Sequence, residues 1–146
     1  MLKTLLQTVD IYYILLVAMC VSFIVGYGSY RCKINDKINN QTLFLEGKPI
    51  FKIDALGFEF DRWSISHILF FALIGFLYPK AFYISMIVGV IWEFIEFSLG
   101  YFKPKWFFDN WCAGVNSINE WWFYRWNDLI MNCIGFLIGM NLSKIM

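Results

Sequence analysis

Five side chains that can bind metals or move protons fall within the most apolar part of this sequence. They are the chain's single histidine, His67, the glutamates Glu93 and Glu96, and the pair Asp128 and Asn132. A charged residue in a membrane-spanning helix costs about 2.5–3.5 kcal/mol on insertion scales, and it usually faces a cavity or a partner. We therefore treat the five residues as a candidate functional cluster.

The spacing within this cluster places its members on shared helix faces. Glu93 and Glu96 are three residues apart, and Asp128 and Asn132 are four apart, so each pair lies on one face of a helix. Carboxylates with an amide oxygen suit calcium, magnesium or manganese better than zinc. His67 is then either a metal ligand or a general base whose tautomer a neighbouring carboxylate fixes.

Each of these residues also has a purely structural explanation. A lone histidine near the start of a helix is commonly a packing residue, and the two glutamates could pair with Arg62 or Arg125 to hold helices together. Asp128 could simply favour the first turn of a helix, where negative charge is stabilising. The coincidence of all these groups at one depth of three helices favours a functional polar site.

The composition predicts the setting of the cluster. Of 146 residues, 60% are hydrophobic and 21% aromatic, whereas 16% are charged, and the mean hydropathy is +0.58. Soluble domains are roughly 45–50% apolar and 25% charged, so we expect a lipid bilayer to cover the excess apolar surface. A net charge of +1 gives no reason to expect a nucleic-acid partner.

The apolar segments predict an all-α, polytopic membrane protein, a single domain over 1–146 with about four transmembrane helices. The second segment is short for a span, so it is either extended by Arg62 and Trp63 or re-entrant, and Pro79 with Lys80 makes the turn that follows it. We interpret the first segment as a retained anchor, because it is too long and too aromatic for a cleaved signal. The expected helices are 10–28, 64–78, 81–101 and 127–143.

Two polar connections should lie on one side of the membrane. The first, 30–62, contains an alternating pattern that predicts a hairpin turning at 46–49, and the second, 102–126, is a tryptophan-rich, partly ordered loop typical of an interfacial belt. This side carries nine of the twelve Lys and Arg residues, which favours a cytosolic location. A sequon at Asn40 and a disulfide between Cys32 and Cys112 would indicate the opposite side.

The segment 61–139 resembles the core of eukaryotic-type phosphatidylserine synthases. That family has an aspartate six residues before a membrane histidine, then a Trp/Phe-Glu-x-x-Glu motif, and later an element with paired tryptophans that leads into a helix with spaced glycines. Phe123 stands where the family has an aspartate after the tryptophans. The matching residues are Asp61, His67, Trp92, Glu93, Glu96, Glu120, Trp121, Trp122, Asp128, Asn132, Cys133, Gly135 and Gly139.

A second resemblance covers the last helix. Asp128, Asn132, Gly135 and Gly139 form the Asp-x-x-x-Asn-x-x-Gly-x-x-x-Gly pattern of VanZ-like membrane proteins, whose length and helix number fit this chain better. The biochemical activity of that family is poorly defined. This resemblance therefore implies a fold, and a noncatalytic protein in which the cluster is structural or binds lipid head groups.

The synthase resemblance implies a membrane transferase that exchanges phospholipid head groups, with serine or another small head group as the second substrate. It implies a divalent cation, calcium first, with manganese or magnesium as alternatives; homo-oligomer formation is left open. The implied roles are catalytic for His67 and Glu93, metal-binding for Glu93, Glu96, Asp128 and Glu120, and substrate-binding for Asn132, Arg125 and Asp61.

Overall fold

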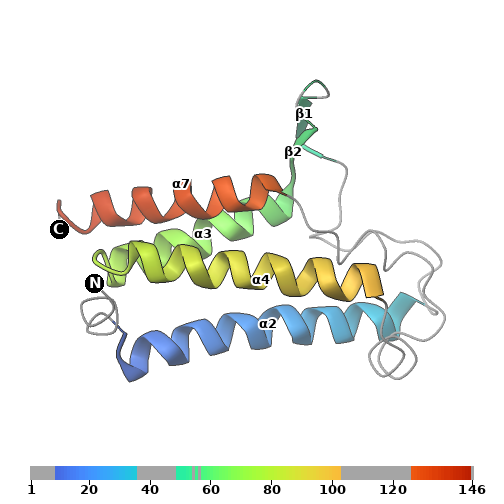
Figure 1. The fold of residues 1–146 in the computed structure, drawn as a ribbon, viewed down its shortest axis with the longest axis horizontal. Helices are drawn as coiled ribbons and strands as arrows, with labels where there is room; N and C mark the ends of the chain where they lie inside the picture. Colours follow the sequence, from blue (N-terminus) through green and yellow to red (C-terminus); the bar gives the residue numbers. More distant parts are fainter. Residues whose placement is uncertain (1–8, 36–48, 54, 56, 103–125, 146) are drawn as a thin grey trace.

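The computed structural model describes residues 9–35, 49–53, 55, 57–102 and 126–145. Within these ranges the chain is mostly helical, which confirms the all-α prediction (Figure 1). The start of α2, the α3–α4 turn and the end of α7 lie at one end of the bundle, and a small hairpin lies at the other. The elements are α2 (Ile11–Asn35), β1 (Phe51–Ile53), β2 (Phe58–Phe60), α3 (Arg62–Leu77), α4 (Phe82–Phe102) and α7 (Trp126–Leu142).

The start of α3 extends the short second helix by two residues, to 16 in all, and leaves open whether it spans a membrane or is re-entrant. Asp61 is its N-cap, and its carboxylate accepts a hydrogen bond from the Ser64 backbone N–H at 2.9 Å, while the Ser64 side chain bonds the Asp61 N–H in return. The helix therefore includes Arg62 and Trp63. It ends before the predicted Pro79-Lys80 turn, where the Ala81 N–H donates to the Tyr78 carbonyl at 2.9 Å.

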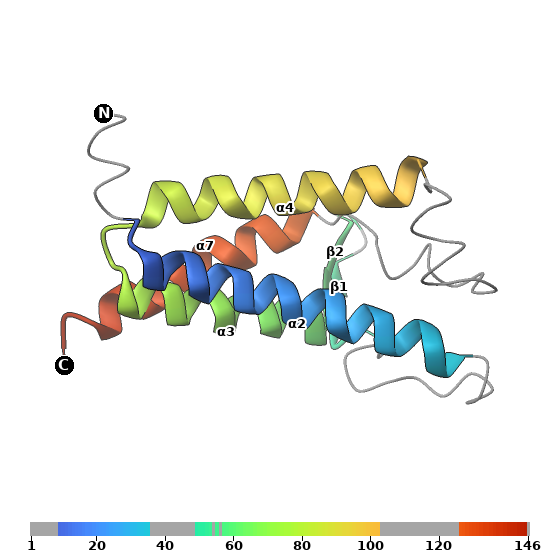
Figure 2. The same cartoon turned by 90° about the horizontal axis from the view of Figure 1, so that it is seen from below.

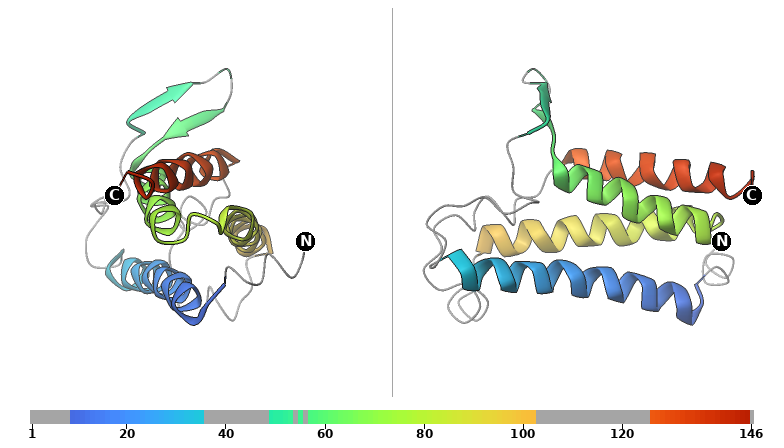
Figure 3. Two further views of the ribbon diagram at one scale, coloured as in Figure 1. Left: turned by 90° about the vertical axis from the view of Figure 1, so that its left-hand side faces the viewer. Right: turned by 180° about the vertical axis from the view of Figure 1, so that it is seen from behind.

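The described hairpin is formed by β1 and β2, which both follow the predicted turn at 46–49. β1 pairs antiparallel with β2, Phe51 opposite Phe60, and Gly57 in the connection has φ of 59°, a left-handed conformation that favours glycine. The residues before Pro49 in the predicted turn lie outside the described part. The hairpin projects sideways from the end of the bundle (Figure 3).

α3 and α7 pack closely along one another, and two glycines make this approach possible (Figure 2). A Cβ atom added at Gly135 would overlap the backbone of Ile68, and one added at Gly139 would overlap the carbonyl of Ala72. Small residues four apart allow two helix backbones to come together. The predicted packing role of this glycine pair is confirmed.

α2 meets the other helices near its two ends. At its first turn, the Tyr13 hydroxyl lies 3.0 Å from the Ser85 hydroxyl of α4, and the Tyr13 ring packs edge-on against Tyr78. At the hairpin end of the bundle, Tyr27 packs edge-on against Trp63 of α3. α2 thus lies alongside α3 and α4, fixed at both ends.

Polar and apolar side chains are distributed in an unusual way over the described residues. Apolar side chains are exposed on all four helices, for example Met19 at 60% and Val90 at 53%. α4 contains the one described stretch that is long and apolar enough to cross a membrane, Phe82–Leu99, and the apolar parts of α2 and α3 are shorter. The buried polar residues are Asp61, Ser64, Ser85, Glu93, Asn127, Asp128 and Asn132.

Candidate metal centre and adjoining cavity

Three helices bring an imidazole and two carboxylates together at one point. A ring nitrogen of His67 on α3, a carboxylate oxygen of Glu93 on α4 and one of Asp128 on α7 all lie within 4.8 Å of one another. The two acidic residues are only 1% and 6% exposed. The convergence inferred from the sequence for these three residues is therefore present in the structure.

Local sequence features set the position of each helix at this point. On α7, the Asn127 side chain donates to the Glu59 carbonyl of β2 at 2.7 Å and ties the start of the helix to the hairpin. On α4, Ser85, Gly89 and Glu93 are spaced four apart, so they share the buried face of that helix. The cluster thus lies where the first turns of α3 and α7 meet the second half of α4.

Asn132 orients the histidine. Its Oδ1 lies 2.7 Å from His67 Nδ1, and both side chains are at the interface of α3 and α7. An amide oxygen only accepts hydrogen bonds, so Nδ1 carries a hydrogen, and in the neutral tautomer of the ring the lone pair is on Nε2. Asn132 also lines the adjoining cavity, and its predicted role in substrate binding stays a prediction.

The charge of the cluster fits a divalent cation. Two ionised carboxylates buried side by side place excess negative charge in a region of low polarity, which a proton or a cation must balance. Oxygens on opposite sides of a calcium ion, each about 2.3–2.6 Å from it, are roughly 5 Å apart. The 4.8 Å limit is compatible with one ion shared by the carboxylate oxygens of Glu93 and Asp128, with the His67 nitrogen beside it.

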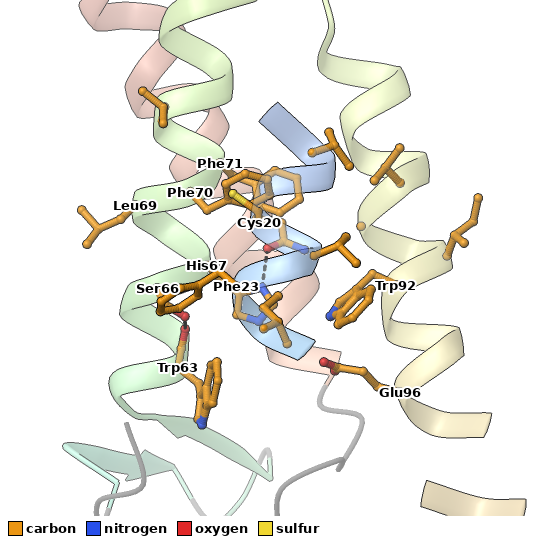
Figure 4. A pocket seen from close by; sticks show the side chains of 18 of the residues that line it. Cys20, Phe23, Trp63, Ser66, His67, Leu69, Phe70, Phe71, Trp92 and Glu96 are labelled. Atoms are coloured by element: carbon orange, nitrogen blue, oxygen red, sulfur yellow. Dashed lines mark hydrogen bonds between the residues drawn. The ribbon is translucent and has the colours of Figure 1, made fainter. Parts of the chain in front are cut away.

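A cavity of about 570 Å³ adjoins the cluster, and all four helices line it. His67, Asn132 and Glu96 contribute its polar wall, and the remaining lining is largely apolar and aromatic. Figure 4 shows the Glu96 carboxylate directed away from its own helix and the His67 ring bonded to the amide beside it.

The remaining predicted site residues have other positions. Asp61 caps α3, as described above, and Glu96 lines the cavity without belonging to the 4.8 Å group. Glu120 and Arg125 lie outside the described residues, as do Cys112 and the side chain of Cys32. Their roles in metal binding, substrate binding and disulfide formation remain predictions.

Gly89 is a site residue that the sequence reasoning missed. A Cβ atom at this position would lie 2.9 Å from Asn132 Nδ2, so the absence of a side chain makes room for the amide that holds His67. The sequence signal that could have identified Gly89 is its spacing of four residues from Glu93, because this spacing places Gly89 and Glu93 on one helix face.

No protein-family model, curated protein or solved structure matches this chain. The resemblances to phosphatidylserine synthases and to VanZ-like proteins therefore rest on the residues quoted for them.

Proposed function

We propose that this chain is a polytopic membrane protein that binds a divalent cation between α3, α4 and α7 and exchanges the head groups of phospholipids. The observation that carries the proposal is the grouping of His67, Glu93 and Asp128 within 4.8 Å beside an apolar cavity. Calcium is the first candidate because carboxylate oxygens are its usual ligands, and manganese and magnesium are the alternatives.

The distribution of side chains supports a membrane location for the whole bundle. Large apolar residues are exposed on α2, α3, α4 and α7, whereas seven polar residues are buried. In water this arrangement would leave much apolar surface exposed, but in lipid it costs nothing. Polar residues inside a membrane usually face the interior of the bundle, as these do.

The roles in the proposed reaction follow from the geometry. Glu93 and Asp128 hold the cation, which would stabilise negative charge on the phosphate of the lipid. Nε2 of His67 takes the proton of the incoming hydroxyl. The hydroxyl oxygen then forms a bond to phosphorus, while the bond from phosphorus to the original head group breaks. The departing alkoxide receives the proton from His67, and Asn132 holds the ring in the tautomer that this transfer needs.

Reconstituted protein provides the test. In liposomes of phosphatidylcholine and phosphatidylethanolamine with calcium and labelled serine, we expect labelled phospholipid to form. His67→Ala should lower the rate by about 10²-fold or more, the usual contribution of a general base, and Glu93→Gln should abolish the reaction. Glu59→Gln is the matched control, because Glu59 pairs with Lys52 on the hairpin, away from the cluster. Activity retained in both cluster variants would refute the proposal.

The hydrogen bond between His67 and Asn132 favours a second candidate, a noncatalytic VanZ-like protein. This bond joins α3 to α7, so the cluster could serve the stability of the bundle or bind a lipid head group. Under this alternative, the same substitutions lower the midpoint of thermal unfolding in detergent, and no lipid turnover occurs with any metal ion.

A further inference from the structure

The cavity extends along part of the depth of one leaflet of a bilayer. Its lining on α3 runs from Trp63 to Leu73, a rise of about 15 Å at roughly 1.5 Å per residue. About 9 Å of this rise lies beyond His67, whereas one leaflet contributes half of a hydrocarbon core about 30 Å thick. The part beyond His67 therefore covers more than half of the extent of the acyl chains of a single leaflet.

Polarity changes along the cavity. Toward the hairpin end, His67, Asn132 and Glu96 present polar groups, and further in the lining consists of side chains such as Phe70 and Val88. Beyond that, the buried core residues Tyr13, Ile74, Ala81 and Phe136 close the bundle. The cavity thus has a polar upper part, an apolar lower part and a floor.

α2 forms the fourth wall of this cavity. It is fixed at its ends by the Tyr13–Ser85 and Tyr27–Trp63 contacts, and between them Val17, Cys20 and other residues face the cavity. Figure 4 draws Cys20 among the side chains that line the cavity, together with Phe70 and Phe71. A ligand in the cavity would therefore lie against Cys20.

We infer that this cavity holds a single acyl chain of a phospholipid, with the head group at His67 and the chain end toward Ile74. The inference rests on the proposed membrane location and lipid substrate. A volume of about 570 Å³ falls within the roughly 300–1,000 Å³ of small-molecule sites. The polar upper part and apolar lower part match the two chemical parts of one lipid chain.

Alkylation of Cys20 by N-ethylmaleimide tests the inference in the full chain. The protein carries Cys32→Ser, Cys112→Ser and Cys133→Ser and is purified in a steroid-based detergent, whose rigid body does not imitate an acyl chain. Lysophosphatidylcholines of increasing chain length are added as probes. Protection of Cys20 should tighten by about fourfold for each methylene and level off when the chain reaches the floor.

Two matched controls separate cavity binding from partitioning into the detergent. Met19 is exposed beside Cys20. In the Met19→Cys, Cys20→Ser variant, protection of the cysteine at position 19 from alkylation should therefore not reach a plateau as the lysolipid chain is lengthened. Val88 lines the cavity and Val90 is exposed on the same helix, so Val88→Trp should abolish protection and Val90→Trp should keep it. Equal protection at positions 19 and 20, or in both tryptophan variants, would overturn the inference.

The outcome is distinguishable from failure of the proposed function. Protection of Cys20 without any cation-dependent exchange supports the acyl-chain site and contradicts the exchange reaction. Exchange that requires Glu93, with no protection of Cys20 by any probe, supports the reaction and overturns the acyl-chain site.

Discussion

The two glutamates of α4 occupy different parts of the site: Glu93 lies with His67 and Asp128, and Glu96 lines the cavity. The spacing of Glu93 and Glu96 indicated a shared helix face, but positions three apart still differ by about 60° around the axis. The packing of α4 against its neighbours directs Glu93 toward His67 and Asp128, and Glu96 toward the cavity. No local sequence pattern encodes that choice. The hydrogen bond from His67 to Asn132 likewise depends on the pairing of α3 with α7.

At this scale we predict that Asn132→Leu destabilises the protein and impairs exchange. The substitution leaves the Nδ1 hydrogen of His67 without its acceptor, which costs about 1–3 kcal/mol for a buried group. Thermal unfolding in detergent measures the loss. Asn141→Leu is the control: Asn141 is exposed near the end of the same helix, so its effect should stay within about 0.5 kcal/mol. Equal destabilisation by the two variants would contradict the assigned role.

Three helices, α3, α4 and α7, were predictable to within two residues at each end, because apolar runs, Pro79 and the spaced glycines mark them. The start of α3 was placed two residues late, since its capping box uses Ser64 where Glu or Gln is the familiar signal. The predicted turn at 46–49 lies mostly outside the described residues, and the described strands turn around Gly57, whose positive φ no local pattern indicated. α2 also continues to Asn35, through residues that are polar enough to suggest a loop.

At the scale of elements, Gly135→Ala should weaken the packing of α3 against α7. The new methyl group overlaps the backbone of Ile68, which cannot rotate away, so we expect a loss of about 1–3 kcal/mol or more. Gly26→Ala provides the opposite control, because no atom lies within 4 Å of its added Cβ and alanine is favoured in a helix by about 0.5–1 kcal/mol. Thermal unfolding of both variants checks the prediction; a stable Gly135→Ala protein would refute close packing.

Asp61 offers a second test at this scale, since its observed capping role competes with the substrate role implied by the synthase resemblance. Asp61→Ala should cost about 0.5–2 kcal/mol, and Asp61→Asn should preserve stability because asparagine caps equally well. If Asp61→Asn is as unstable as Asp61→Ala, the capping account is wrong. Normal stability with lost exchange in Asp61→Asn would support a role for the charge on the substrate.

Over the described residues, the molecule exposes large apolar side chains and buries seven polar residues beside an apolar core. The cavity was not predictable, because side chains from four helices define it and its volume depends on how α2 is held at its ends. The cluster and the cavity meet at His67, so cation binding and lipid binding are expected to share one site.

Binding of a paramagnetic cation tests the central claim most directly. We expect purified protein in lipid nanodiscs to bind one Mn²⁺ per chain, detected by electron paramagnetic resonance and displaced by calcium. His67→Ala should retain this binding because the histidine acts as the base, and Glu59→Gln should also retain it. Glu93→Gln should lose it. Unchanged Mn²⁺ binding in Glu93→Gln, or no saturable binding in the native chain, would contradict the account.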